Sequence, residues 1–536
     1  MRTVTRPVEV CVQLPVDVLP VMAGLPAVLM AIAALAISQA VSRRAQPWAL
    51  FHGLSAGALL VALVSLPWAL SAADALATAR LPGLAVTLTS AWMALLVQLL
   101  GTVIGAFSAR YLEGEPRQSR YAAALASVLG AVHVLLLADH WIVLIAAWSA
   151  VGVALQKLLC FYPDRPFALL AAHKKRLADR AADALLVAAA ALAWAQVGSG
   201  SLSELQEYAA RAGASPALQA SALCLVLAVI LRTALLPVHG WLIQVMEAPT
   251  PVSALLHAGV VNLGGYVLIR FAPMLEAASP ARWLLVAFGL ATAALAGLVM
   301  LTRISIKVRL AWSTVAQMGF MLLECGLGLY TLAMLHLVGH SLYKAQAFLA
   351  SSSVVRQSRL MAMRGDEPPS VASLVLAPAG AAAIVALLAS ASGAASWPWW
   401  WSGVLALAWA PLLWLPAATS NRTRMAAGRA AAGAALVAVL TALAQLAHAL
   451  PLGAKDAPNH AAGLLAFAGL AALYLCLMFL HWRPHALETW RRWSYAGFYV
   501  DEFTTRLALR LWPTQWAGAM AHPAPADGGR PATVSR

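Results

Sequence analysis

The chain has 536 residues, of which 62% are hydrophobic and only 11% charged, and it carries a formal net charge of +15. Soluble domains carry roughly 25% charged residues, so this chain lacks the polar surface of a soluble globule, whereas lipid would solvate it well. Apolar segments of about 20 residues, the length of a membrane-spanning helix, recur along almost the whole chain. We count about fifteen, at 17–40, 51–71, 83–107, 121–138, 140–162, 181–197, 217–241, 252–276, 282–302, 308–329, 331–352, 370–392, 399–417, 428–450 and 462–481.

The basic residues are distributed unevenly over the loops between these segments. The odd-numbered loops hold most of the Lys and Arg side chains, whereas the even-numbered loops hold only Arg80, Arg211, Arg270, Arg282 and Lys455. Loops rich in Lys and Arg face the cytoplasm. We therefore expect a multi-pass protein of the cell inner (cytoplasmic) membrane, with its N-terminus outside and its C-terminal tail in the cytoplasm. This distribution explains the net charge without a nucleic-acid partner.

Several common cofactor signals are missing from the sequence. The five cysteines contain no CxxC pair, which argues against a disulfide framework, an iron–sulfur cluster or a structural zinc site. No glycine-rich dinucleotide motif and no P-loop occurs. We therefore expect this chain to hold no cofactor of its own.

A first group of polar and proline residues interrupts the apolar pattern in the middle of the chain. A charge at the centre of a spanning helix costs about 2.5–3.5 kcal/mol, so retained charges indicate function. Proline frees backbone groups that only a neighbour or a water-filled cavity can satisfy, and broken helices are how transporters build ion sites. The alternative is a proline kink beside a core histidine, which the density of this group disfavours. Its members are Arg232, Pro237, His239, Pro249, Pro251 and His257.

A second group follows, with Lys307 and then His336, His340 and Lys344 at intervals of four residues. This spacing stacks three titratable side chains on one helical face. Two histidines so spaced can bind zinc, but the sequence offers no HExxH motif and no nearby carboxylate or cysteine was found to complete the site. A hydrated row that passes protons is the better interpretation, because histidine titrates near neutral pH and burial can shift a lysine toward it. Structural polar packing is the remaining alternative.

These two groups resemble the antiporter-like subunits of respiratory complex I and of Mrp-type sodium/proton antiporters. The motifs that carry the resemblance are LPxHxWL…APTPVSALLHAG and WSTxxQMGF…HxxxHxxxKA. The resemblance implies an all-α, polytopic membrane protein of about 14–15 transmembrane helices, with two inverted five-helix repeats that each contain a broken helix. It implies N-terminal helices over 1–107, repeats over 108–276 and 277–417, C-terminal helices over 418–481, and an amphipathic tail with a disordered end over 482–536.

The sequence departs from the proton-pumping members of that family. These relatives pair a Glu in the fifth span with a Lys in the seventh, and here Ser149 and Arg232 stand at those positions. Arginine is effectively never deprotonated, so it can place a charge but cannot relay a proton. Segment 370–392 also lacks the charged residue that the relatives carry. We expect Asp183 with Arg180, and Lys157, to substitute in part for the missing pair.

These losses, together with the LLCFYPDRP and GFYVDE motifs, resemble the membrane subunit of DAB-type inorganic carbon transporters. The resemblance implies that flow of H⁺ or Na⁺ drives bicarbonate accumulation, with CO2 hydration on a zinc-containing, carbonic-anhydrase-like partner subunit, DabA. The chain itself would then be a transporter subunit and not an enzyme. The aromatic and Arg-rich tail at 486–516 fits either docking of a protein partner or contact with membrane lipid.

Two other functions remain open from the sequence. One is an L-like, proton-translocating subunit of a complex I or hydrogenase-type assembly, which a neighbouring quinone- or hydrogen-linked subunit would indicate. The other is a component of a self-standing Mrp-type cation/proton antiporter, which rescue of salt sensitivity by this chain alone would indicate.

Overall fold

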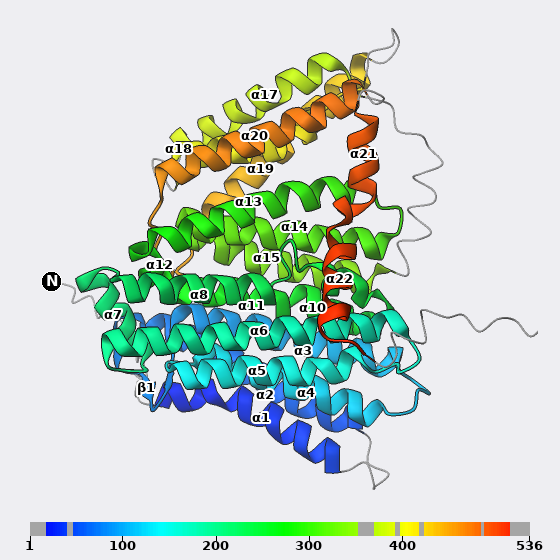
Figure 1. Ribbon diagram of the computed structural model, residues 1–536. Coiled ribbons are helices and arrows are strands. Elements are labelled where there is room, and N and C mark those ends of the chain that lie inside the picture. Colours follow the sequence, from blue (N-terminus) through cyan, green and yellow to red (C-terminus); the bar gives the residue numbers. More distant parts are fainter. Residues whose placement is uncertain are drawn as a thin grey trace, which may run out of the picture.

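The computed structural model describes residues 18–39, 47–351, 369–391, 397–416, 423–483 and 487–514. The described chain is almost entirely helical, and its long helices run roughly parallel to one another (Figure 1). The last two helices, α21 and α22, instead run across the ends of the others along one side of the molecule (Figure 1). The disordered end that we predict for the tail over 482–536 lies outside the described residues, which stop at residue 514.

A helix is broken in the middle of the chain, between Arg232 and Gly240. The elements before this break are α1 (Leu19–Gln39), α2 (Pro47–Ser71), η3 (Ala73–Thr78), β1 (Arg80–Leu81), β2 (Leu84–Ala85), α3 (Leu88–Tyr111), α4 (Gln118–Leu137), α5 (Trp141–Leu159), α6 (Pro166–Val197), α7 (Leu202–Ala212) and α8 (Pro216–Arg232). The strands β1 and β2 pair antiparallel as a small hairpin in the loop before α3.

The elements after the break are α9 (Gly240–Gln244), η4 (Val245–Glu247), α10 (Thr250–Ala258), η5 (Val260–Asn262), α11 (Leu263–Arg270), α12 (Ala272–Ala277), α13 (Ser279–Leu301), α14 (Ile306–Leu327), α15 (Tyr330–Leu349), α17 (Val371–Ala391), α18 (Trp399–Trp409), η6 (Ala410–Leu413), α19 (Thr423–His448), α20 (His460–Trp482), α21 (Glu488–Tyr495), η7 (Gly497–Tyr499) and α22 (Val500–Leu511).

The predicted membrane spans agree with these helices. Among the described residues, 12 helices are long and apolar enough to cross a membrane, and α8 and the α18–η6 segment are shorter apolar helices. The remaining predicted segment is α15, whose polar row lowers its hydropathy. The prediction of an all-α, multi-pass membrane protein is therefore confirmed. The boundaries of the two repeats stay a prediction.

Two segments differ in detail from the sequence-based expectation. Helix α6 begins at Pro166, well before the predicted start at 181. The prediction missed this first half because Lys174, Lys175 and Asp179 lower its hydropathy. The resemblance implied a second broken helix in the later repeat, yet α17 continues as a helix through Pro378.

Local sequence explains where several helices start and stop. At the start of α3, the Thr87 side chain accepts from the Ser90 amide and the Ser90 hydroxyl accepts from the Thr87 amide, which forms a capping box. Pro166 and Pro216 occupy the first turns of α6 and α8, where the missing N–H is tolerated. Helix α14 ends at Gly328, whose φ of 78° is readily adopted by glycine.

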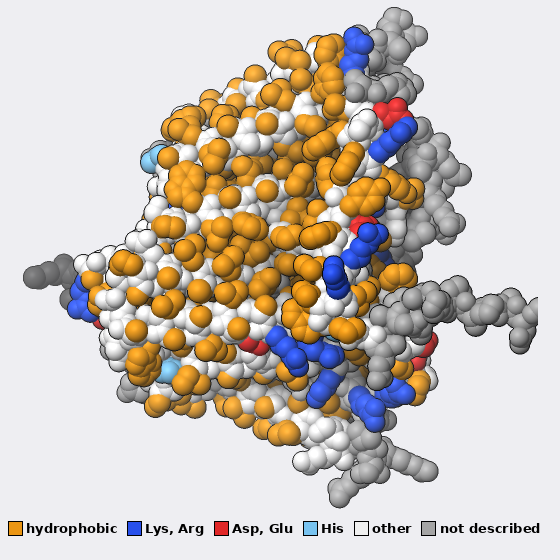
Figure 2. Space-filling view, in the orientation of Figure 1, with side chains coloured by type: hydrophobic (Ala, Val, Ile, Leu, Met, Phe, Trp, Pro, Cys, Tyr) orange, Lys and Arg blue, Asp and Glu red, His pale blue; other side chains and the backbone are white. Residues whose placement is uncertain are grey.

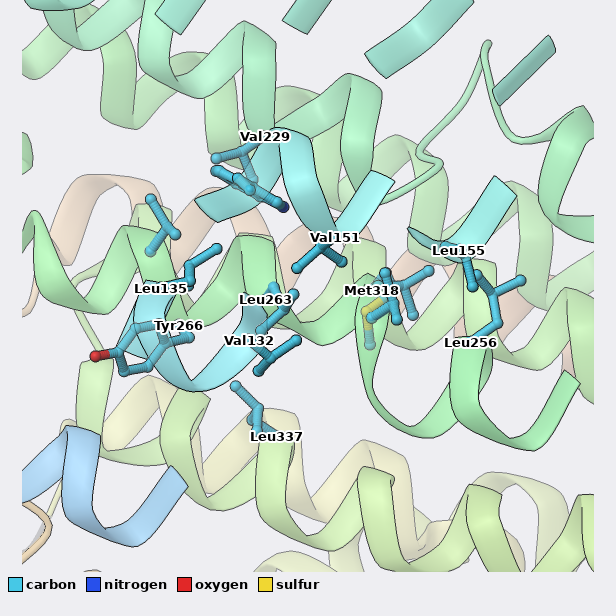
Figure 3. Packing of buried hydrophobic residues seen from close by; sticks show 14 of the residues in the cluster. Val132, Leu135, Val151, Leu155, Val229, Leu256, Leu263, Tyr266, Met318 and Leu337 are labelled. Atoms are coloured by element: carbon cyan, nitrogen blue, oxygen red, sulfur yellow. The ribbon is translucent and has the colours of Figure 1, made fainter. Parts of the chain in front are cut away.

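The core lies among the helices on both sides of the break. Buried side chains from α4, α5, α8, α10, α11, α14 and α15 pack together there, including Val132, Leu155, Val229, Leu256 and Met318 (Figure 3). The segment α10–α11 is almost completely buried by its neighbours: in its most apolar stretch, 94% of the residues are buried. A helix this enclosed presents its polar residues to protein rather than to lipid.

The outer surface divides by side-chain type. Hydrophobic side chains cover the sides of the long helices, and Lys and Arg side chains gather along the edge where α21 and α22 lie (Figure 2). Such a basic edge beside an apolar belt is typical of the cytoplasmic side of a membrane protein.

Two glycines allow α13 and α14 to approach closely. A methyl group placed on Gly319 of α14 would lie 2.7 Å from the backbone nitrogen of Ala293, and one placed on Gly289 of α13 would lie 2.7 Å from the carbonyl oxygen of Gly319. Small residues at such crossings let helix backbones pack in a membrane, where no hydrophobic force drives association.

We expect Gly319→Val to lower the free energy of unfolding by about 1–3 kcal/mol, because the added side chain meets backbone atoms that cannot move aside. Thermal unfolding of the purified protein in mild detergent measures the change. Gly297→Val is the matched control, because a methyl group at Gly297 meets nothing within 4 Å. Equal melting temperatures for the two variants would contradict a tight α13–α14 crossing.

Candidate functional site

The chain breaks its helix in the middle of the first predicted polar group. Helix α8 ends at Arg232, and α9 restarts at Gly240. Between them Ala234 has a φ of 56°, and Pro237 lacks the amide that a continuing helix would use. After a short 3-10 turn, α10 starts at Thr250 with Pro251 in its first turn. The break that the prolines predict near Pro237 is therefore present, and the second helix, which we expect after Pro251, starts one residue before it, at Thr250.

Arg232 is held at the break by groups from two other helices. Its guanidinium forms an ion pair with Asp183 of α6 and donates to the carbonyl oxygen of Trp148 of α5 at 2.9 Å. It also lies 4.7 Å from the centre of the Trp148 ring. The Ser149 hydroxyl donates to the same Asp183 oxygen at 2.8 Å. The serine at the position of the absent glutamate thus contacts a carboxylate supplied by the neighbouring helix.

The other two residues that we expected beside this pair lie elsewhere. Arg180 and Lys157 are both exposed. Lys157 lines an open cleft with Arg117 and Arg120 on the outside of α4 and α5. The structure therefore brings together Asp183 and Arg232, and not Arg180 or Lys157.

A second ion pair lies one helical turn away on α6. Lys175 pairs with Asp179, both on the face that carries Asp183, and the Lys175 nitrogen lies 5.4 Å from the centre of the Trp241 ring on α9. Residues at intervals of four stand above one another on a helix. We call Ser149, Lys175, Asp179, Asp183 and Arg232 the α6 cluster.

The three titratable residues predicted on one helix face lie on α15. The His336 Nδ1 atom is 2.8 Å from Glu324 Oε2 of α14, and the His336 and His340 rings are 6.0 Å apart. Lys344, with only 1% of its side chain exposed, donates to the Leu310 carbonyl oxygen at 2.9 Å and to the Ser313 hydroxyl of α14. We call Glu324, His336, His340 and Lys344 the α15 row.

Two histidines of the first predicted group occupy the buried space between these helices. The His257 ring of α10 stacks on the Phe348 ring of α15, with the ring centres 4.5 Å apart. Within the described residues, neither ring nitrogen of His257 or of His340 has a hydrogen-bond partner. The His239 ring packs against Trp312 at 4.8 Å.

Lys307 lies at the start of α14, where its ammonium donates to the Thr250 hydroxyl at 2.9 Å. It therefore contacts the first residue of α10, just after the broken segment. Lys307 is half-buried, so it stands between the exposed end of the helix bundle and its interior. Of the predicted pathway residues, all but Arg180 and Lys157 thus contact the interior of the molecule.

The α15 row contains one residue that sequence reasoning missed. Glu324 is 12 residues from His336 in the chain, so the statement that no carboxylate lies near this histidine pair needs correction. The sequence carries a signal for this residue, because Glu324 is a lone carboxylate in an apolar span. The structure then buries it, with only 3% of the residue exposed. No group of three or more His, Cys, Asp or Glu side chains placed to hold a metal ion occurs in the described part of the chain.

The two groups differ in what they can do chemically. The α6 cluster is built from paired opposite charges, which fix one another in place. The α15 row combines a carboxylate, two histidines and a lysine, all of which can gain or lose a proton. Such a row can pass protons between neighbours if water or small rotations bridge the gaps.

Comparison with known proteins gives the class. Residues 138–409 match the family described as NADH:quinone oxidoreductase/Mrp antiporter, TM. A chain in the structure of the Mrp complex from Dietzia sp. DQ12-45-1b has the same fold, with a TM-score of 0.57 and 21% identity, covering 96% of this chain but 64%, less than two thirds, of that chain. The fold is that of an antiporter-like membrane subunit.

Sequence relatives narrow the class. The chain is 41% identical over 419 residues to the "Probable inorganic carbon transporter subunit DabB" of Hydrogenovibrio crunogenus, covering 76% of this chain and 79% of that protein. It is 39% identical over 435 residues to the "Probable inorganic carbon transporter subunit DabB2" of Halothiobacillus neapolitanus, covering 78% and 79%. The chain belongs to the DabB family of inorganic carbon transporter subunits.

We expect Asp183→Ala to lower the free energy of unfolding by about 3 kcal/mol, because it leaves the buried Arg232 cation with only neutral partners. The double variant Asp183→Leu/Arg232→Met should lose less than the sum of the two single changes. Thermal unfolding in detergent measures all three, and Arg180→Ala, an exposed change on the same helix, is the control. Strictly additive losses would contradict a coupled pair.

Proposed function

We propose that the protein is the membrane subunit of an energy-coupled inorganic carbon transporter, and that H⁺ or Na⁺ moving through it drives bicarbonate accumulation. The observation that carries this proposal is the α15 row, in which Glu324, His340 and Lys344 are buried between α14 and α15 and His336 is half-buried beside Glu324. Burying titratable groups in a membrane protein is costly, and such groups usually serve ion pathways. The relatives named as inorganic carbon transporter subunits supply the substrate class.

The pathway residues then have distinct roles. Lys307 lies at the end of the bundle that we propose to be cytoplasmic, where an ion could enter. His257, His340, His336 and Lys344 carry protons or organise water, with Glu324 as the partner of His336. Arg232 and Asp183 hold the broken helix by a fixed charge pair, because arginine does not release its proton.

The proposed orientation follows from the charge distribution. The basic edge along α21 and α22 (Figure 2) faces the cytoplasm of a cell with an inner membrane. The N-terminus then lies outside. The tail helices would then be accessible to a cytoplasmic partner through their exposed aromatic and Arg side chains.

Hydration of CO2 needs a hydroxide that a zinc ion can generate near neutral pH. We assign this chemistry to a zinc-containing, carbonic-anhydrase-like partner, DabA, bound as a heterodimer, because the resemblance to DAB-type transporters implies such a partner. The relatives from Hydrogenovibrio crunogenus and Halothiobacillus neapolitanus are named as transporter subunits, which supports a complex of more than one chain.

The transport function can be tested on the α15 row. We expect Lys344→Ala or His336→Ala, expressed with the partner, to reduce bicarbonate-dependent growth at low CO2 by at least about tenfold, because removing one member interrupts the proton path. The protein should still reach the membrane, which immunoblotting of membrane fractions checks.

Lys157→Ala is the matched control, because Lys157 is a lysine at an exposed position outside the row. Growth of this variant should equal that of the wild type. Normal uptake by both Lys344→Ala and His336→Ala would show that the row is structural packing.

A second test concerns the partner. We expect a zinc protein to co-purify with this chain in mild detergent, with zinc measured by elemental analysis of the complex. Recovery of a quinone-linked or hydrogenase subunit instead would favour the redox-complex alternative, and rescue of salt sensitivity by this chain alone would favour an antiporter.

A further inference from the structure

The last helix of the described chain is tied to the broken segment by one carboxylate. Asp501, in the first turn of α22, places Oδ1 2.5 Å from the Lys174 ammonium of α6 and accepts from Gln244 Nε2 of α9 at 2.7 Å through Oδ2. Lys174 also donates to the Thr505 hydroxyl, one turn further along α22, at 2.7 Å. Three elements far apart in the sequence therefore meet at one ion pair.

This ion pair is enclosed, whereas the helix that carries Asp501 is not. The Lys174 and Asp501 side chains are 7% and 17% exposed. Every residue of α22, including Asp501, nevertheless keeps some contact with solvent or lipid. Apart from Asp501 and Thr505, the contact of α22 with α6 includes a hydrogen-bond distance of 3.1 Å between His173 Nε2 and the Trp512 carbonyl oxygen. The attachment of α22 thus depends on polar contacts more than on apolar packing.

The local sequence makes room for this carboxylate. Gly240, the first residue of α9, faces Asp501 so closely that a methyl group there would overlap the carboxylate and the Lys174 ammonium. Any other residue at this position would push Asp501 out of its place. The restart of the broken helix and the tail are therefore fitted to each other.

The tie reaches the α6 cluster directly. Lys174 is followed by Lys175, which pairs with Asp179 one turn before Asp183, the partner of Arg232. Gln244 lies on α9 beyond the break that Arg232 precedes. Asp501 thus contacts both α6, which carries Asp183, and α9, which follows the break after Arg232.

A second contact links the tail to α14. The Arg303 guanidinium lies 5.7 Å from the centre of the Tyr495 ring of α21 and 5.3 Å from that of Trp312. Trp312 precedes Ser313, which accepts from Lys344 of the α15 row. The same tail therefore contacts residues beside both polar groups.

Within the part of the chain that the structure describes, the outer face of α22 is exposed. Its exposed apolar side chains, Phe503, Leu507, Leu511 and Trp512, alternate with Arg506 and Arg510. Aromatic and Arg enrichment of this kind is typical of protein interfaces. A protein bound here would contact a helix whose inner face holds the broken segment.

We propose that Asp501 is a positioning residue that couples the partner to the ion route, because it clamps the tail helix to α6 and α9. The coupling part of this inference rests on the proposed function. A partner that shifts α22 would move Lys174 and Gln244, and with them the elements that flank Arg232.

The clamp itself can be tested without any transport assay. In membrane vesicles with the tail accessible, Asp501→Asn should speed tryptic cleavage at Arg506 and Arg510 by about tenfold or more, because the variant loses a charge-assisted hydrogen bond in an enclosed site. Gly240→Ala should act similarly by displacing the carboxylate. Glu502→Gln, a change to the adjacent exposed carboxylate, and Gly297→Ala, at an open position, are the matched controls.

The coupling is tested in the complex with the partner. Asp501→Asn should retain the partner on co-purification yet lose most bicarbonate uptake, and the charge exchange Lys174→Asp/Asp501→Lys should restore part of it. Unchanged tryptic cleavage of Asp501→Asn would overturn the clamp, and faster cleavage with normal uptake would overturn the coupling. Absence of uptake by the wild-type complex would instead refute the proposed function, while the cleavage arm still decides on the clamp.

Discussion

A charge buried at the centre of a membrane-spanning helix costs about 2.5–3.5 kcal/mol on insertion scales, and this constraint organises the whole molecule. Most helices satisfy it by carrying almost no charge, so they present apolar side chains to lipid. Many of the charges that remain inside lie on α6, α8, α14 and α15. Arg232, Glu324 and Lys344 have partners on neighbouring helices, whereas Lys175 pairs with Asp179 on α6 itself. Helices with these charges must pack against each other, and the arrangement of the bundle follows from that need.

The same constraint separates two kinds of polar group. In the α6 cluster each carboxylate faces a cation, and Arg232 keeps its charge under all physiological conditions. Such a group can hold the broken helix in one arrangement but has little capacity to exchange protons. In the α15 row the neighbours are histidine, carboxylate and lysine, which can change protonation state as an ion passes. Ser149, Asp183 and Arg232 thus lie in a group of fixed charge at the break, and the residues that can exchange protons gather in the α15 row.

Much of the fold could be predicted because hydropathy reports directly on lipid exposure. Each predicted apolar segment contains a helix, and the prolines at 237, 249 and 251 mark the break and the restart. Pairings were harder to predict. Asp183 was predicted as a partner at the break, and it does pair with Arg232. Arg180 and Lys157 were predicted beside it but are exposed. The rotation of a helix about its own axis decides which side chains face inward, and residue spacing alone does not encode that rotation. Glu324 and Asp501 depend on contacts across 12 and 327 residues, which a single sequence does not reveal.

If ions move along the polar row on α15, water must reach the side chains of that row. The most direct measurement is labelling of Ser341→Cys, between His340 and Lys344, by a small water-soluble thiol reagent in native membranes, using an otherwise cysteine-free chain. The control is Ser221→Cys, which is equally buried but lies away from the row, at the α6–α8 contact. Both serines are hydrogen-bonded, Ser221 to the Ala189 carbonyl oxygen and Ser341 to the Asn262 amide, so the two positions differ in their place and not in their bonding. We predict that the cysteine at 341 reacts and the cysteine at 221 does not. Equal lack of reaction at both positions, in complexes that still transport, would contradict the account.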